Sequence, residues 1–206
     1  MVIAIDGPAG AGKSTVARAV AERLGFTYLD TGAMYRAVAL ASAGREDQAA
    51  DIASRAEIRV GDRVLLDGRD VTDEIRTPEA SAGASRVAAD SGVRAALVRM
   101  QPAIVEDGDW VAEGRDIGSV VAPDAAVKVF LTATPEERAR RRAAQTGGDA
   151  RSVLREQRER DQRDMSADRT VLEPAADAVP VDTTGLTLDE VVAQIETLAV
   201  EARELR

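Results

Sequence analysis

The sequence contains no cysteine, no histidine and no asparagine among its 206 residues. Without cysteine the protein forms no disulfide and has no thiolate nucleophile. Without histidine it lacks the usual general base and the usual zinc ligand, so a bound metal should be a hard, oxygen-ligated ion such as Mg²⁺. Without asparagine it cannot carry the Asn-Lys-x-Asp motif with which GTPases read guanine, which excludes that class of nucleotide-binding protein.

Long apolar runs are also missing, since no segment approaches the roughly 20 residues of a membrane span. The first six residues have the pattern of a strand rather than of a secretory signal, so we expect a cytoplasmic protein without a membrane partner. The net charge of −9 argues against a nucleic-acid-binding surface. Only Lys13 and Lys128 are lysines among the 27 basic residues. The others are arginines, which bind phosphate in a bidentate manner.

The most informative segment is Gly-Pro-Ala-Gly-Ala-Gly-Lys-Ser at residues 7–14, which matches the P-loop pattern. An apolar strand pattern precedes it and a helix pattern follows it, as phosphate-binding loops require. In such a loop Lys13 reaches the outer phosphates and Ser14 binds Mg²⁺. The loop therefore predicts a nucleoside triphosphate and Mg²⁺, without predicting the reaction. The residues expected to contact the nucleotide are Gly7, Pro8, Ala9, Gly10, Ala11, Gly12, Lys13, Ser14 and Thr15.

Strand-like and helix-like segments alternate along the chain, which is typical of a mostly parallel sheet covered by helices on both faces. We expect strands near 1–6, 26–29, 110–112, 127–131 and 178–181, and helices near 15–24, 31–43, 47–56, 78–89, 93–107, 134–146, 150–164 and 187–202. Residues 57–68 have the pattern of a small hairpin between helices. We interpret that hairpin as part of an insertion on the α/β core.

Two further stretches follow predicted strands, where α/β sheets present ligand-binding groups. Asp-Thr-Gly-Ala-Met-Tyr-Arg (30–36) is either a second anion site at a helix N-terminus or an N-cap followed by a solvated arginine. Glu-Gly-Arg-Asp-Ile-Gly (113–118) is either a phosphate clamp or a surface ion pair in a glycine turn. The residue patterns alone leave both alternatives open.

Arginines are concentrated in the two helices expected near 134–146 and 150–164. Most of them should be solvated and paired with glutamates. Phosphoryl transfer between two anions nevertheless needs cations over the transferring oxygens, which a mobile lid supplies. The residue pattern does not decide which of these arginines fill that role, and we name Arg142 as one candidate. A phosphate acceptor is already anionic near neutral pH, with a second pKa of about 6. The absence of histidine therefore fits a phosphate acceptor, which needs no base.

The blocks at 5–15, 30–36, 113–118, 123–125 and 160–164 occur in one order along the chain, and with them the sequence resembles the bacterial cytidylate (CMP) kinase family. The resemblance implies an α/β P-loop kinase, a three-layer sandwich with a central parallel sheet. It implies a small α+β monophosphate-binding insert and a short helical lid. It also implies a cytoplasmic monomer of pyrimidine nucleotide metabolism that uses ATP and Mg²⁺ to phosphorylate CMP or dCMP. The implied bounds are core 1–35, 86–137 and 165–206, insert about 36–85 and lid about 138–164.

The same resemblance assigns roles by position. The implied substrate contacts are Thr31 and Arg36 at the CMP phosphate, Ser85 and Arg94 at the cytosine, Arg115 and Asp116 at the phosphate end, Arg160 near the phosphates and Asp164 at the ribose. The base assignment has a physical reason, because cytosine offers acceptors at O2 and N3 where uracil presents an N3–H donor, and two facing donors leave a buried group unpaired. The chain departs from the family at Ala167, where an arginine is usual.

Rival functions remain at this stage. A kinase for UMP, for AMP or for an alcohol such as shikimate shares the P-loop chemistry. A nucleotide sensor without enzymatic activity would keep Lys13 and Ser14, but it would not need the 30–36 block or the arginine-rich helices. Turnover of ATP that depends on an acceptor separates the enzyme from the sensor.

Overall fold

The computed structural model describes residues 1–165 and 173–204. The chain folds into two compact units. The first unit consists of Met1–Tyr28 and Gly108–Arg206, and the second unit consists of Leu29–Asp107. Within the described ranges, no helix is long and apolar enough to span a membrane.

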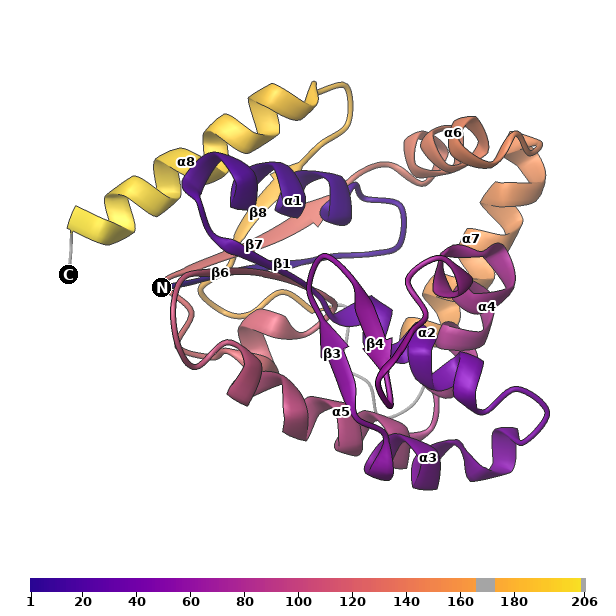
Figure 1. The fold of residues 1–206 in the computed structure, drawn as a ribbon. Coiled ribbons are helices and arrows are strands. Elements are labelled where there is room, and N and C mark those ends of the chain that lie inside the picture. The colour runs from indigo at the N-terminus through magenta and orange to yellow at the C-terminus, as the bar shows by residue number, and fades with distance from the viewer. Residues whose placement is uncertain (166–172, 205–206) are drawn as a thin grey trace. The chain divides into compact units, whose positions relative to one another are not determined.

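A five-stranded sheet, drawn in Figure 1, organises the first unit. The central strand β1 (Val2–Asp6) pairs in parallel with β6 (Trp110–Glu113) on one side and with β7 (Val127–Thr132) on the other, and β7 pairs in parallel with β8 (Val179–Asp182). Four of the five residues of β1 are buried, as expected for a strand covered on both faces. In spatial order the strands are β2 (Thr27–Asp30), β6 (Trp110–Glu113), β1 (Val2–Asp6), β7 (Val127–Thr132) and β8 (Val179–Asp182).

Two helices of the first unit, α1 (Lys13–Leu24) and α8 (Leu188–Glu204), lie side by side in Figure 1 and share a core with the sheet. The buried residues of that core include Ile3, Ile5, Val20, Leu131, Val192 and Ile195. A second helix pair, α6 (Pro135–Thr146) and α7 (Ala150–Met165), packs together after β7. A short π-helical turn, η3 (Ile117–Val121), follows β6.

The second unit is mainly helical and has its own core, which includes Met34, Val38, Ile75, Val93 and Leu97. Its helices are α2 (Thr31–Ala41), α3 (Ala49–Arg55), α4 (Pro78–Val87) and α5 (Ser91–Ile104), with two 3₁₀ turns, η1 (Glu46–Gln48) and η2 (Glu74–Arg76). An antiparallel sheet of β3 (Ile58–Val60), β4 (Val64–Leu66) and β5 (Arg69–Asp70) completes it.

The alternation of strands and helices predicted from the sequence is present in the structure. The predicted hairpin at 57–68 has a third strand, β5, which the sequence did not indicate. That strand has only two residues, both charged and exposed, so it carries no apolar pattern. Its turn uses Asp67 in a left-handed conformation, with a φ of 51°.

Candidate active site

The connections that leave β6, β1, β7 and β8 all begin at one edge of the sheet in the first unit. These strands are parallel, so their carboxyl ends meet there. Open α/β sheets bind ligands at this edge, next to the strand where the order reverses. The reversal falls at β1, because the chain reaches β6 on one side before β7 on the other.

The loop after β1 requires glycine for two different reasons. A Cβ on Gly7 would lie 2.1 Å from the carbonyl oxygen of Leu131 in β7, so only glycine lets the chain leave β1 beside β7. Gly12 has a φ of +92°, which an L side chain rarely adopts. Helix α1 then begins at Lys13 without a side-chain cap from Gly12. The N-terminus of a helix carries partial positive charge, so the loop geometry fits a polyphosphate.

Lys13 is almost fully buried, with 7% of its surface exposed, and its Nζ donates to the carbonyl oxygen of Pro8 at 2.9 Å. The side chain is therefore folded back over the loop that it belongs to. Ser14 and Thr15 are exposed in the first turn of α1. Among the described residues, no group of three or more acidic, histidine or cysteine side chains could hold a metal ion.

Asp6, the last residue of β1, is buried and reaches the segment after β6. Its Oδ1 accepts the backbone N–H of Ile117 and its Oδ2 accepts that of Gly118, both at 2.8 Å. The pKa of Asp6 is raised to about 6, mainly by burial and to a smaller extent by nearby Asp116. The two backbone N–H groups and Lys13 act in the opposite direction. Asp6, Lys13 and Asp116 thus interact at one place in the first unit.

The stretch predicted as a phosphate clamp, 113–118, starts with a buried carboxylate. Glu113 accepts a hydrogen bond of 2.5 Å from the hydroxyl of Tyr28. Arg115 is half-buried, and its guanidinium lies 3.4 Å from the carbonyl oxygen of Gly114. Asp116 is buried. The alternative interpretation, an exposed surface ion pair, does not fit this burial.

Helices α6 and α7 are attached to the outer side of the P-loop by Arg138, which is buried. Its guanidinium donates to the carbonyl oxygen of Ala9 at 2.9 Å and to Asp161 of α7 at 2.7 Å. Gln157 of α7 donates to the carbonyl oxygen of Arg138 at 3.3 Å, and a Cβ on Gly10 would lie 2.7 Å from its Nε2. Residues of both arginine-rich helices therefore contact the loop.

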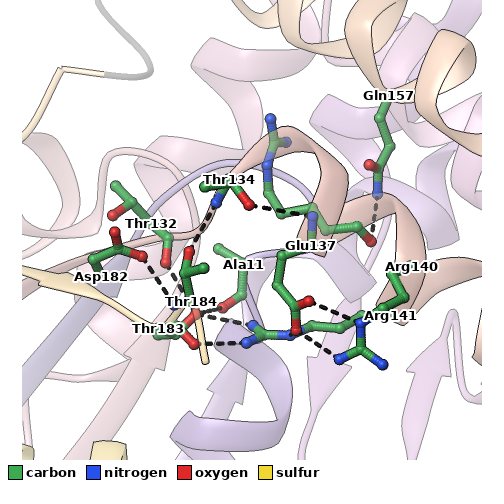
Figure 2. Close-up of polar contacts among 11 residues, drawn as sticks. Ala11, Thr132, Thr134, Glu137, Arg140, Arg141, Gln157, Asp182, Thr183 and Thr184 are labelled. Atoms are coloured by element: carbon green, nitrogen blue, oxygen red, sulfur yellow. Dashed lines mark hydrogen bonds and ion pairs between the residues drawn. The ribbon is translucent and has the colours of Figure 1, made fainter. Parts of the chain in front are cut away.

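A polar network beside the loop, drawn in Figure 2, holds a second arginine of α6. Arg141 donates to Glu137 at 2.8 Å, and to the hydroxyl and carbonyl oxygens of Thr183 at 2.9 and 2.7 Å. The Thr183 hydroxyl is 3.3 Å from the carbonyl oxygen of Ala11 in the loop. Hydrogen bonds from Arg140, and then from Arg141, lower the pKa of Glu137 to about 2. Glu137 therefore stays ionised and keeps Arg141 beside the loop.

The predicted site residues do not include Arg138, Arg141 or Thr183. The residue predicted from α6 is Arg142. Arg142 is half-buried in the structure. The spacing of three and four residues that joins Arg138, Arg141 and Arg142 indicates one helix face, but it does not say which member meets the loop. A signal for Thr183 was present as well, since it directly follows β8 at the ligand-binding edge of the sheet.

In the second unit, α2 begins with a short polar cluster. Asp30 caps the helix by accepting the N–H of Ala33 at 3.0 Å and forms an ion pair with Arg36 at 2.7 Å. Arg36 is only partly exposed, and its Nε is buried without a hydrogen-bond partner. Thr31 is buried beside them. The predicted N-cap is thus present, and Arg36 is held at the N-terminus of the helix rather than extended into solvent.

Two of the remaining predicted substrate residues lie on different helices of the second unit. Ser85 is buried on α4, and Arg94 is half-buried on α5. The side chains of Arg160 and Asp164 lie outside the described part of the structure, and so does Ala167.

Comparison with known proteins gives one consistent family. The sequence model named cytidylate kinase matches residues 3–201. The cytidylate kinase of Desulforamulus reducens is 50% identical, and that of Carboxydothermus hydrogenoformans is 47% identical, with 95% of each chain covered in both cases. Among solved structures, a gluconokinase from Sinorhizobium meliloti 1021 matches with a TM-score of 0.53 at 20% identity, covering 99% of this chain and 94% of that one. That likeness concerns the fold alone, and it agrees with the predicted α/β P-loop kinase fold.

Proposed function

The chain belongs to the cytidylate kinase family, and we propose that it transfers the γ-phosphoryl group of ATP to CMP or dCMP. The similarity to cytidylate kinases over nearly the whole chain is the observation that carries this proposal. The P-loop with its buried lysine supports the kinase chemistry independently of it.

The donor nucleotide is assigned to the P-loop, residues Gly7 to Thr15. On binding, Lys13 exchanges its hydrogen bond with the neutral carbonyl of Pro8 for charge-assisted hydrogen bonds to phosphate oxygens, which are about twice as strong. The hydroxyl of Ser14 is the ligand that the chain offers to Mg²⁺, which when bound neutralises charge on the phosphates.

The acceptor nucleotide is assigned to Thr31 and Arg36 for its phosphate and to Ser85 and Arg94 for its base. Arg36 supports this assignment, because a phosphate could receive the hydrogen of its unpartnered Nε. The further substrate contacts are Arg115, Asp116, Arg160 and Asp164. We propose 36–85 as the monophosphate-binding insert and 138–164 as the lid.

In the proposed reaction, an oxygen of the CMP phosphate attacks the γ-phosphorus in line. A new P–O bond forms there while the bond to the β-phosphate oxygen breaks, which releases ADP. No base is required, because the attacking oxygen is already anionic. The charge on the transferring group is stabilised by four cationic side chains, Lys13, Arg115, Arg142 and Arg160. Asp116 is the fifth residue that we assign to the catalytic group. Closure of the lid excludes water, so hydrolysis of ATP without CMP should be slow. We propose a cytoplasmic monomer.

The test is release of ADP from ATP and Mg²⁺ with no acceptor and, separately, with CMP, dCMP, UMP, AMP and shikimate. Fast release with CMP or dCMP alone is the expected result. Release with UMP or AMP instead would keep the reaction and change the substrate. Tight ATP binding without acceptor-dependent release would point to a nucleotide sensor.

A further inference from the structure

Asp6 links two distant parts of the chain, and this contact has no role in the proposed reaction. The backbone ladder between β1 and β6 ends at the pair Ile5 and Glu113, followed by one hydrogen bond of 3.1 Å from Gly114 to Ile5. Beyond it, Asp6 pairs along its backbone with Phe130 of β7 on the other side. Its side chain continues the connection toward the segment after β6.

That connection is specific in geometry. The two carboxylate oxygens each accept one backbone N–H, from Ile117 and from Gly118, at 2.8 Å. These are the first two N–H groups of η3, so Asp6 caps this turn from another strand. Asp116 stands at the N-cap position of η3 but does not make the capping hydrogen bond. The capping role that a local aspartate usually fills is therefore taken by Asp6.

We propose that Asp6 is a positioning residue for phosphoryl transfer, which holds the segment 115–118 through Ile117 and Gly118 and so fixes where Arg115 and Asp116 present their side chains. The proposal rests on the proposed function, which gives Arg115 and Asp116 their roles at the substrate phosphate. A displacement of about 1 Å in such groups lowers the rate of a positioned reaction by about a hundredfold.

The electrostatic setting supports a positioning role over a role in stability. Burial makes the ionised carboxylate unfavourable, which is why the pKa of Asp6 rises to about 6, with Asp116 acting in the same direction and Lys13 against it. A buried charge of this kind is weak evidence for stability. A side chain that breaks a local rule in this way is expected at a functional site.

The variant that tests the proposal is Asp6→Asn, because its amide keeps the size of the side chain but can accept only one of the two N–H groups well. The matched control is Asp70→Asn, which removes a carboxylate that accepts the N–H of Thr72 at 3.0 Å on the exposed sheet of the second unit. Thermal melting establishes that both variants fold. Isotope-edited NMR then follows the exchange rates of the Ile117 and Gly118 amides, and calorimetry gives the Kd for ATP.

We expect Asp6→Asn to speed exchange at Ile117 and Gly118, to leave the Kd for ATP within about threefold of the wild type, and to lower kcat/KM for CMP about thirtyfold or more. Asp70→Asn should change none of these by more than about twofold, as surface changes usually do. Faster exchange with normal kcat/KM for CMP would overturn the proposal, and so would an equal loss of ATP binding and CMP turnover.

If Asp6→Asn does not fold, Asp6→Glu takes its place, since it keeps two acceptor oxygens on a longer side chain. It should retain ATP binding and lower kcat/KM for CMP, whereas unchanged turnover would contradict the proposal. If the wild type fails to phosphorylate CMP, the proposed function is wrong. The proposal that Asp6 fixes the position of 115–118 is then tested by the amide exchange rates alone. Unchanged rates at Ile117 and Gly118 in Asp6→Asn would refute it.

Discussion

Three buried charged side chains of the first unit bind backbone groups, whereas the candidate phosphate-binding arginine of the second unit binds another side chain. Lys13 and Arg138 are buried and donate to carbonyl oxygens of the P-loop, and Asp6 accepts from two backbone amides. Arg36 is partly exposed and pairs with Asp30. Backbone partners fix a position closely, because the strand and the helix on either side hold them.

This difference indicates two kinds of site. If the loop in the first unit binds the donor polyphosphate as proposed, it is preorganised for charge that develops at a fixed place during transfer. At the start of α2, Arg36 can exchange its ion pair with Asp30 for a pair with a phosphate. Asp30 would keep its capping hydrogen bond with Ala33, and the Nε of Arg36 is a donor without a partner. We therefore expect changes in the first unit to affect the chemical step or the fold, and changes at Arg36 to affect acceptor binding.

The largest effect is expected for Lys13→Ala. Loss of a cation on the transferring phosphates should lower kcat about a thousandfold. Steady-state kinetics with ATP and CMP measure this change. Arg59→Ala is the control, because Arg59 is exposed and pairs with exposed Glu57, and its activity should stay within about twofold of the wild type. Near-normal activity in Lys13→Ala would refute the P-loop assignment.

Gly7→Ala should come next, with an effect on folding. Its Cβ would lie 2.1 Å from the carbonyl oxygen of Leu131, so strand or loop must move, and we expect a loss of at least about 3 kcal/mol in the free energy of unfolding. Gly25 also has a positive φ, +68° against +145° for Gly7, but a Cβ there meets nothing within 4 Å, so Gly25→Ala should cost only about 1 kcal/mol. Urea denaturation compares the two, and equal losses would show that close approach is not the cause.

Arg36→Met should raise KM for CMP about a hundredfold and leave KM for ATP within about threefold, because a charge-assisted phosphate contact is lost from the acceptor only. Asp30 keeps its capping hydrogen bond with Ala33, so the helix should persist. Arg45→Met is the control, as Arg45 donates to a carbonyl oxygen at the other end of α2. A rise in both KM values would remove the contrast between the units.

The smallest effect is the pH dependence that Asp6 gives to stability. A carboxyl whose pKa is raised in the folded state stabilises the fold fully below its unfolded pKa, and this stabilisation is lost as pH rises through about 6. The free energy of unfolding of the wild type, relative to Asp6→Asn, should therefore fall by about 2 kcal/mol between pH 4 and pH 7.

Urea denaturation of both proteins at the two pH values measures this difference. Asp70 supplies a control of opposite sign, because hydrogen bonds from Thr72 lower its pKa. The difference in the free energy of unfolding between the wild type and Asp70→Asn should become smaller as the pH falls through the ordinary pKa range of aspartate. A difference between wild type and Asp6→Asn that does not vary with pH would mean that Asp6 titrates normally.

Much of the first unit follows from local sequence signals. The P-loop, its flanking strand and helix, and the alternation that predicts a parallel sheet all depend on residues close together in the chain. The contacts between Asp6 and 117–118, and between Arg141 and Thr183, join residues far apart, so no spacing rule reveals them. The sequence does not decide which of Arg138, Arg141 and Arg142 faces the loop, because the rotation of α6 about its axis is set by packing. Strand β5 was not predicted because its two residues, both charged, show no alternation of apolar and polar side chains.

The most direct test of the contrast between the units uses two variants, Lys13→Ala and Arg36→Met. Calorimetry measures the Kd of each variant for ATP and for CMP, and the four values are compared with those of the wild type. We expect Lys13→Ala to lose affinity mainly for ATP and Arg36→Met to lose affinity mainly for CMP. If either variant lost affinity for both nucleotides equally, the assignment of donor and acceptor phosphates to the two units would be wrong.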